Sequence, residues 1–181
     1  VYKRQTMHEQ SRSATFERGL FKVDDSLLEL GGNVYIDDGD WVVMSDSLHW
    51  DEKNEKLFFH GLSHVLEQSG ELELSCFFGA FDAAQESGWF ASEEVGSGTK
   101  ARVRQDDVWL EADRLEVPAD SLEPLSAMGR VEIQDTSRVW KVWGSDALRR
   151  QGAGGENLVS VRGGSSGRAR YMDASSSDTL W

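Results

Sequence analysis

The stretch ELELSCFF, residues 71–78, alternates apolar and polar side chains with a period of two. Its apolar members would share one face of an extended strand; they are Leu72, Leu74, Cys76 and Phe78. The same alternation recurs in ARVRQDDVWLEA (101–112) and GRVEIQ (129–134). A period of two with one polar face predicts half-buried antiparallel strands.

Segments rich in Gly, Asp and Asn separate these strands, and no sustained helical periodicity occurs between them. The expected turns are GGN (31–33), DDGD (37–40), DEKNEK (51–56), EQSG (67–70), GSGT (96–99) and PAD (118–120). Short strands punctuated by turns at this spacing are typical of an all-β sandwich, roll or solenoid.

Weak internal repeats accompany the strand pattern. The segment SDSLHW (45–50) recurs as ADRLEV (112–117) and SDALRR (145–150), while CFFGAFD (76–82) occupies the interval between the first two. In that interval, Phe81-Asp82 parallels Trp50-Asp51. A valine that closes a strand follows in each unit, at positions 34, 65, 95, 131 and 161. The sequence therefore predicts about five units of about 30–36 residues.

Each unit would be a strand pair that cannot bury its apolar face alone. Stacked units continue the hydrogen-bond ladder and build one elongated core. The aspartates of the repeated step, which we expect at the strand rim or as acceptors for turn amides, are Asp46, Asp113 and Asp146.

Three blocks carry a resemblance to a known family: DGDWVVMSDSLHWDEKNEKLFFHG (38–61), LELSCFFGAFDAAQESGWF (72–90) and VWLEADRLEVPADSLEPLSAMGRVEIQD (108–135). Their pattern of A/S-D-x-L, a short turn and then G-x-V resembles the organic-solvent-tolerance (OstA-like) family of lipopolysaccharide transport proteins. The resemblance covers about residues 16–150, and the Gly/Ser-rich tail and the many tryptophans depart from it.

The resemblance implies an elongated, half-open, taco-like β-jellyroll in the periplasm of a Gram-negative cell. It further implies a protein that is not an enzyme and needs no cofactor. Such a protein binds lipopolysaccharide by its acyl chains and passes it to the outer membrane. Its end strands would pair with other jellyrolls of the transport system, or with a second copy of itself.

The composition agrees with this expectation in part. The chain has 181 residues and a formal net charge of −13, from 19 Lys and Arg against 32 Asp and Glu. This charge argues against a nucleic-acid partner, because phosphate contacts require a basic surface. It would also keep lipid phosphates outside, so that binding is led by the acyl part. The lone Cys76 lies in an apolar run, and we expect a buried, inert thiol without a disulfide or metal role.

Alternation and resemblance together predict an inner, lipid-binding face. Its expected members are Leu48, Trp50, Leu72, Leu74, Phe78, Val103, Leu110, Leu115, Val131 and Ile133. Several tryptophans lie in strand-like segments, where they would either line a site for lipid or sugar or pack within the core; they are Trp41, Trp50, Trp109, Trp140 and Trp143.

Other constellations favour no catalytic or metal site. His60 and His64 stand four residues apart, with His49 nearby, but four residues of a strand span ~13 Å, too far to chelate zinc. The acidic cluster Asp37-Asp38-Gly39-Asp40 lacks the ligand spacing of a calcium loop and is predicted to be a solvated turn. Two alternatives stay open: a closed β-solenoid or roll that acts as a scaffold or adhesin, and a carbohydrate-active enzyme on a β-roll.

The chain ends define the expected domain. Residues 1–5, VYKRQ, resemble a translated sequencing adapter, so we expect non-native residues there and a single jellyroll over 6–181. The final Leu180-Trp181 predicts a strand that is cut, and we expect truncation at both ends. The Gly/Ser-rich region 151–170 is predicted to be a mobile loop that flanks one short strand, 158–161.

Overall fold

The computed structural model describes residues 5–9, 12–22, 24, 26–70, 72–82, 84–85, 87–93, 98–105, 107–119, 124–135, 137, 140–151, 157–164, 168–173 and 179–180. Over these residues the chain forms sixteen β-strands in one antiparallel sheet and no α-helix. Within the same ranges, no helix has the length and apolar composition needed to cross a lipid bilayer.

Six strands are long, with 11 or 12 residues each: β4 (Leu27–Asp37), β5 (Trp41–Asp51), β6 (Lys56–Glu67), β7 (Leu72–Asp82), β12 (Leu125–Asp135) and β13 (Trp140–Gln151). The shorter strands are β1 (Gln5–Glu9), β2 (Arg12–Phe16), β3 (Arg18–Lys22), β8 (Ser87–Ala91), β9 (Ala101–Gln105), β10 (Val108–Ala112), β11 (Arg114–Val117), β14 (Asn157–Arg162), β15 (Arg170–Asp173) and β16 (Thr179–Leu180).

The long strands bend in the middle, so that each contributes to two layers. In β7, residues 72–75 pair with β9, whereas residues 78–82 pair with β8. In β12 the first half pairs with β11 and the second half with β10. Layer A contains β3, β8, β11, β14 and the halves of the long strands that pair with them; layer B contains β1, β2, β9, β10, β15, β16 and the other halves.

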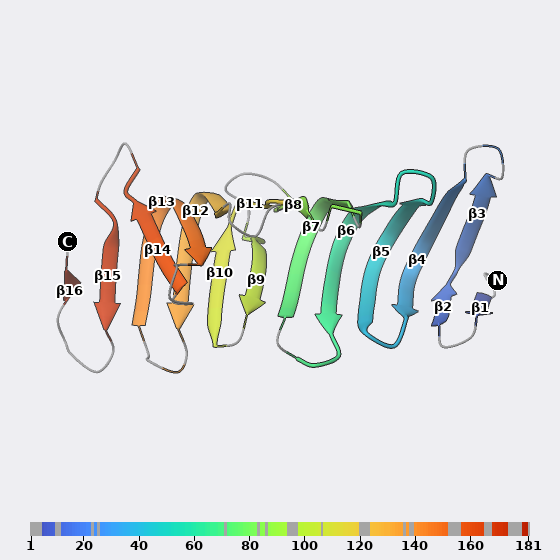
Figure 1. Ribbon diagram of the computed structural model, residues 1–181, viewed down its shortest axis with the longest axis horizontal. Coiled ribbons are helices and arrows are strands. Elements are labelled where there is room, and N and C mark those ends of the chain that lie inside the picture. Colours follow the sequence, from blue (N-terminus) through green and yellow to red (C-terminus); the bar gives the residue numbers. More distant parts are fainter. Residues whose placement is uncertain are drawn as a thin grey trace.

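The two layers lie on either side of a line of bends, called here the fold line. Strands stand side by side along the long axis of the molecule, with the two termini at opposite ends (Figure 1). Turns at the far ends of the strands form two separate rims, with residues 52–55 on layer A and residues 38–40 and 68–70 on layer B. The prediction of an all-β, elongated, half-open jellyroll is therefore confirmed.

Glycine and an acidic neighbour make the bends of β4, β6 and β12. Gly32, Gly61 and Gly129 have φ angles of 78°, 83° and 71°, which favour glycine over any residue with a Cβ. The carboxylates of Glu17, Asp46 and Asp113 lie over these glycines, in that order, so closely that an added Cβ would meet a carboxylate oxygen at 2.5–2.6 Å. The chain can thus change layer while its strands stay paired.

The bends change two expectations about turns and repeats. The segment GGN (31–33) is not a turn, because Gly32 and Asn33 adopt positive φ inside β4 and bend the strand without ending it. Asp46 does accept a backbone amide, but it accepts it from Leu62 at the bend of β6, at 2.9 Å. The unit between Asp46 and Asp113 has no repeated aspartate. Its strand β7 instead places Phe77 beside the Gly61 bend of β6.

The valines expected to close strands do not do so, because β4, β6, β12 and β14 continue past positions 34, 65, 131 and 161. Two other expectations are confirmed. The repeat parallel is confirmed, since Trp50-Asp51 of β5 and Phe81-Asp82 of β7 pair with the same two residues of β6, Leu57 and Lys56. The strand expected at 158–161 is part of β14. Val95 and much of GSGT (96–99) lie outside the described residues, and the mobility of 151–170 stays a prediction.

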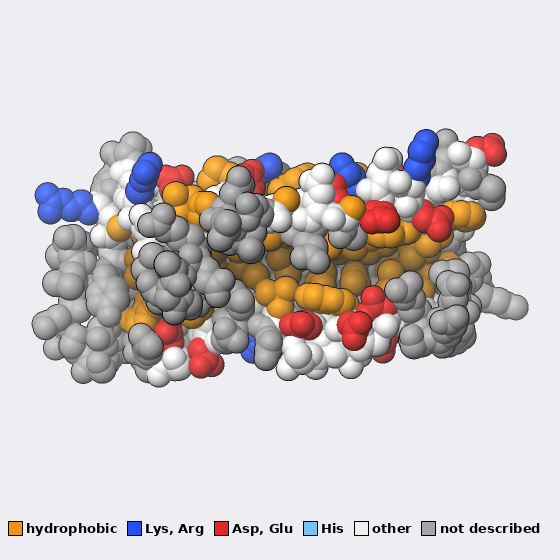
Figure 2. Space-filling model, in the orientation of Figure 1, with side chains coloured by type: hydrophobic (Ala, Val, Ile, Leu, Met, Phe, Trp, Pro, Cys, Tyr) orange, Lys and Arg blue, Asp and Glu red, His pale blue; other side chains and the backbone are white. Residues whose placement is uncertain are grey.

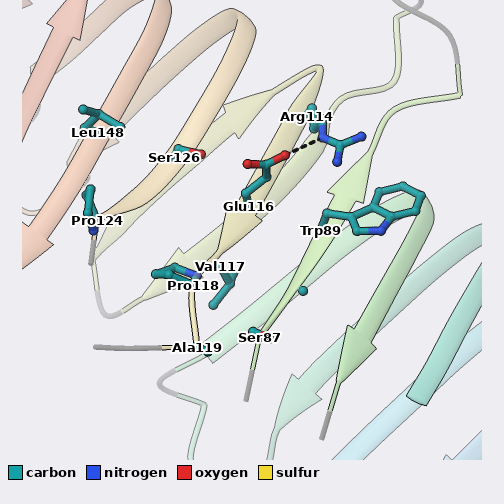
Figure 3. A pocket seen from close by; sticks show the side chains of 11 residues that line it. Ser87, Trp89, Arg114, Glu116, Val117, Pro118, Ala119, Pro124, Ser126 and Leu148 are labelled. Atoms are coloured by element: carbon teal, nitrogen blue, oxygen red, sulfur yellow. Dashed lines mark hydrogen bonds and ion pairs between the residues drawn. The ribbon is translucent and has the colours of Figure 1, made fainter. Parts of the chain in front are cut away.

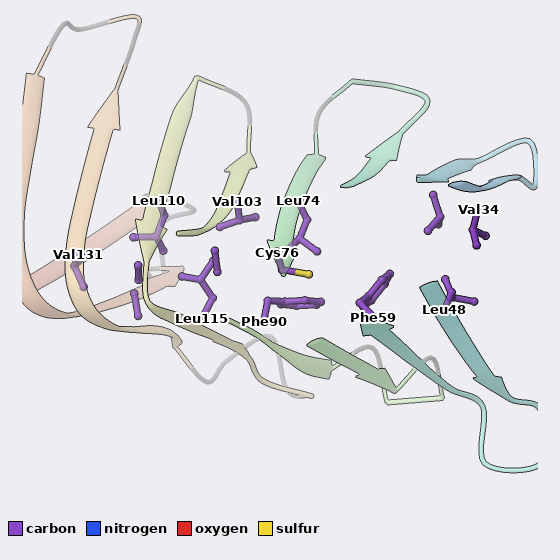
Figure 4. Packing of buried hydrophobic residues seen from close by; sticks show 14 of the residues in the cluster. Val34, Leu48, Phe59, Leu74, Cys76, Phe90, Val103, Leu110, Leu115 and Val131 are labelled. Atoms are coloured by element: carbon purple, nitrogen blue, oxygen red, sulfur yellow. The ribbon is translucent and has the colours of Figure 1, made fainter. Parts of the chain in front are cut away.

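The core lies between the layers. Layer B directs Val34, Leu74, Val103 and Leu110 toward Leu48, Phe59, Phe90 and Leu115 of layer A (Figure 4). These side chains are at most 7% exposed. Fully burying such a side chain contributes about 1.5–3 kcal/mol, so the facing rows hold the two layers together.

Candidate functional site: an apolar groove between two rims

An apolar band runs along the molecule between the two rims and is hollowed at its centre (Figure 2). Hydrophobic side chains that are only partly buried, and that pack against the core, form this band. Layer A contributes Leu28, Trp50, Leu57, Phe81, Val117 and Leu125, and layer B contributes Ile36, Val65, Leu72, Val108 and Trp140.

Register explains why these side chains form rows. On layer A, Trp50 is paired directly with Leu28 on one side and with Leu57 on the other, and Leu57 is paired in turn with Phe81. Residues opposite each other in antiparallel strands point to the same face. Four apolar side chains from four strands therefore line one lip of the groove without interruption.

A second row lies one step deeper in layer A and is filled. Leu30, Leu48, Phe59, Phe90 and Leu115 are at most 4% exposed. Gly79 interrupts this row between Phe59 and Phe90, whose ring centroids are 6.2 Å apart. The two phenyl rings occupy the space that a larger side chain would need, because a Cβ on Gly79 would lie 2.8 Å from Phe90 Cδ1.

Nine of the ten predicted inner-face residues do lie on the inner face. Trp50 and Leu72 lie at the mouth; the buried ones are Leu48, Leu74, Val103, Leu110, Leu115, Val131 and Ile133. Depth distinguishes these two groups, since a ligand in the groove meets the mouth residues first. Contact of any of them with lipid stays a prediction.

The inner position expected for Phe78 is wrong. Its side chain is 36% exposed and lies on the outer face, near His60 and Phe77 at ring-centroid distances of 6.3 and 5.0 Å. The cause is the bend: Cys76 pairs with Ser63 and Phe78 with His60, so the alternation shifts by one residue at Phe77. Gly79 takes the inward position instead.

Sequence reasoning missed several mouth residues, including Leu57, Phe81, Leu125 and Trp140. Phe81 appears in the repeat comparison and Trp140 among the strand tryptophans, but neither was assigned to the inner face. A shift in alternation where the strands bend would have been the signal. In β7, a shift at Phe77, opposite the Gly61 bend of β6, turns Phe78 outward and Phe81 inward.

Acidic residues crowd both rims. Asp38 Oδ1 accepts the backbone N–H of Trp41 at 2.7 Å and that of Asp40 at 3.1 Å, which closes the turn between β4 and β5. On the opposite rim, hydrogen bonds from the Asn54 side chain and backbone lower the pKa of Asp51. These carboxylates belong to hydrogen-bonded turns, as the sequence predicts, and surround an apolar opening with negative charge.

The histidines do not form the pair considered from the sequence. His60 lies beside His49, with 4.9 Å between ring centroids, and partial burial together with the charge of His49 lowers the pKa of His60. His64 lies beyond the bend, where it pairs with Met44 and Ser75 of layer B. Within the described part of the chain, no group of three or more His, Cys, Asp or Glu could hold a metal ion.

Cys76 lies at the closed side of the roll. It is 1% exposed, and burial raises the pKa of its thiol to about 12. The expectation of a buried thiol is confirmed. Because the thiolate is the reactive form, this position is chemically inert in the folded protein.

Fold and groove together define an all-β, half-open roll with an apolar interior and acidic rims. No family model matches the chain, and no curated protein matches it in sequence. Among solved structures, it is similar to LptH from Pseudomonas aeruginosa, described as the LptA-homologous periplasmic component of the conserved lipopolysaccharide transport device. The similarity covers 95% of each chain, at 8% sequence identity and a TM-score of 0.31.

Proposed function

We propose that this protein binds lipopolysaccharide non-covalently by its acyl chains and passes it across the periplasm toward the outer membrane. The observation that carries the proposal is the open apolar groove, whose lip on layer A is the row of Leu28, Trp50, Leu57 and Phe81. Its role is that of a carrier, and it requires no covalent step and no cofactor.

The physical chemistry of the groove suits an acyl ligand. Each CH₂ group removed from water contributes about 0.8 kcal/mol, so a few apolar contacts along one chain add up. Acidic turns such as those of Asp38 and Asp51 border the opening. Negative rims repel lipid phosphates, so the acyl part leads the entry and the phosphates stay outside or are bridged by divalent cations.

Partners would bind at the ends of the roll. The path of paired strands runs from β1 at one end to β16 at the other. A terminal strand of a sheet can pair with a strand of another protein by backbone hydrogen bonds. We infer that other jellyrolls of a transport bridge, or a second copy of this chain, would continue the sheet and with it the groove.

A photo-crosslinking pair tests the proposal. Benzoylphenylalanine replaces Phe81, which packs at the mouth of the groove, or Phe58, which pairs with His49 and Ala80 on the outer face. Both substitutions exchange one aromatic residue for another. We expect lipopolysaccharide adducts at position 81 and none above background at position 58.

Equal labelling at both positions, or no labelling in a folded protein, would overturn lipid binding in the groove. The second candidate, a structural scaffold or adhesin, would then be favoured by the filled second row, in which Leu48 and Leu115 are at most 1% exposed. Circular dichroism of each variant establishes that it is folded.

A further inference from the structure

A cavity of about 570 Å³ opens on layer A beside the groove, where β8 and β11 are short. Its lining residues are Ser87, Gly88, Trp89, Arg114, Glu116, Val117, Pro118, Ala119, Pro124, Ser126 and Leu148 (Figure 3). Strand pairing places Glu116 opposite Trp89, on the outer face. Val117 follows on the inner face, where it also packs against the core. The cavity is therefore an outer-face site whose edge reaches the groove.

The cavity combines an aromatic surface with an ion pair whose net charge is zero. Arg114 Nε donates to Glu116 Oε1 at 2.9 Å, and the Arg114 guanidinium carbon lies 4.9 Å from the centroid of the Trp89 ring. Ser87 and Ser126 add hydroxyl groups that both donate and accept. The remaining lining is apolar and includes two prolines, which restrict the backbone.

We propose that this cavity binds a neutral saccharide, namely uncharged sugar units of the lipid whose acyl chains occupy the groove. The inference rests on the proposed function. Sugar rings present apolar C–H faces that pack on an aromatic ring and hydroxyl groups that need both donors and acceptors. Trp89 supplies the aromatic face, Arg114 supplies hydrogen-bond donors, and Glu116 supplies hydrogen-bond acceptors. The volume lies within the range of about 300–1,000 Å³ that small-molecule sites occupy.

Charge decides against a phosphate group as the occupant. The only cation among the lining residues, Arg114, is already paired with Glu116, and no net positive charge remains for an anion. On a chain with a formal net charge of −13, a phosphate would have to overcome long-range repulsion as well. A neutral sugar meets neither obstacle.

Two probes separate this inference from the proposed function. A neutral oligosaccharide of hexose units, without phosphate or acidic sugars, tests the cavity, and a fluorescent fatty acid tests the groove. The readout for the sugar is the indole N–H signal of Trp89 in a ¹H–¹⁵N spectrum of the full chain, identified by its absence in the conservative variant Trp89→Phe. We expect this signal to shift on titration with the oligosaccharide at millimolar concentration.

Variants then locate the binding. Trp89→Ala should weaken oligosaccharide binding about tenfold or more, and Trp89→Phe, which keeps an aromatic face, should weaken it less. The control is Trp143→Ala, on β13 in the half that pairs with β15 of layer B. It should leave the affinity unchanged. None of the three should alter binding of the fatty acid by more than about twofold.

Absence of a shift at Trp89 in the wild-type protein would overturn the inference, even if Trp89→Ala failed to fold. The same holds if the oligosaccharide binds equally well to Trp89→Ala, or if the Trp89 signal responds to a proline-rich peptide and not to the sugar. Failure of the fatty acid to bind would overturn the proposed function alone, because the sugar probe carries no acyl chain.

Discussion

Asp46 lies over Gly61 at the fold line, and Asp46 Oδ2 accepts the N–H of Leu62 at 2.9 Å. The carboxylate satisfies an amide that the bulge in β6 removes from the ladder, while glycine provides the positive φ of 83°. Glu17 over Gly32 and Asp113 over Gly129 repeat the arrangement. An acid above a glycine is therefore the local feature that bends β4, β6 and β12.

Replacing Gly61 by alanine should destabilise the protein by about 3 kcal/mol, through backbone strain and through the clash with Asp46. Gly70→Ala is the matched control: Gly70 has a similar φ of 79°, but an added Cβ would meet nothing within 4 Å. It should cost only about 1 kcal/mol. Urea denaturation measures both free energies of unfolding. Equal losses would show that the Asp46 contact contributes nothing.

Arg130→Ala should lower the free energy of unfolding more than Arg114→Ala does, because it removes the partner of a buried carboxylate. Asp113 is 6% exposed and accepts from Arg130 Nε at 2.9 Å. Arg114→Ala is the control, since Arg114 and Glu116 are each 45% exposed, and such pairs contribute about 0–1 kcal/mol. An effect of Arg130→Ala as small as that of Arg114→Ala would contradict the role assigned to Arg130 as the partner of the buried Asp113.

The strand pattern could be predicted because period-two alternation is a local property, and one polar residue in two is enough to reveal it. The bends could not be read in the same way. Gly32 and Gly61 look like turn residues in the sequence, and whether a glycine ends a strand or bends it depends on the neighbouring strand. At the Gly61 bend that neighbour supplies Asp46, which lies in a different strand.

The groove residues, too, could be predicted only in part. Alternation assigns Trp50 and Leu48 to one face correctly, but it contains no information on depth, and only the packing of both layers separates the mouth from the filled interior. Alternation alone misplaces Phe78, because the period of two shifts by one residue at Phe77. The wall of the outer cavity could not be expected either, since Trp89 and Glu116 lie far apart in the sequence and meet only through pairing of β8 with β11.

Stability should fall as the pH falls below 6.5, with a contribution from His60. Partial burial and the nearby His49 lower the pKa of His60 below its ordinary value of 6.5. Between the two values the unfolded chain binds more protons at this residue than the folded protein, so folding is disfavoured there, and the loss levels off below the folded-state pKa. Urea denaturation at several pH values across this range should show a free energy of unfolding that depends less steeply on pH in His60→Gln than in the wild type. In His49→Gln, partial burial still lowers the pKa of His60. The pH dependence of the free energy of unfolding should therefore be weaker than in the wild type but stronger than in His60→Gln. An unchanged pH dependence in His60→Gln would refute this assignment.

Phe81→Ser should weaken binding of a fluorescent fatty acid about three- to tenfold, because it removes a phenyl group from the lip of the groove. Phe81 is partly buried against the core, and its strand partner Leu57 shares the lip. The matched variant Phe58→Ser makes the same change on the outer face and should bind as the wild type does. Similar losses in both would point to a general effect on the fold, which thermal unfolding of the two variants would reveal.

Cys76 should react with a thiol reagent such as dithionitrobenzoate only when the roll opens. With a pKa of about 12, on the order of one thiol in ten thousand is ionised at pH 8, and the residue is only 1% exposed. We therefore expect labelling at the rate of unfolding, complete within the mixing time in concentrated urea and slow in buffer. A bound fatty acid should slow it further by stabilising the folded roll. Fast labelling in buffer that the fatty acid blocks competitively would instead mean that the groove reaches the fold line. The buried side chains of Leu48, Phe59 and Phe90 would then have to move apart to admit the ligand.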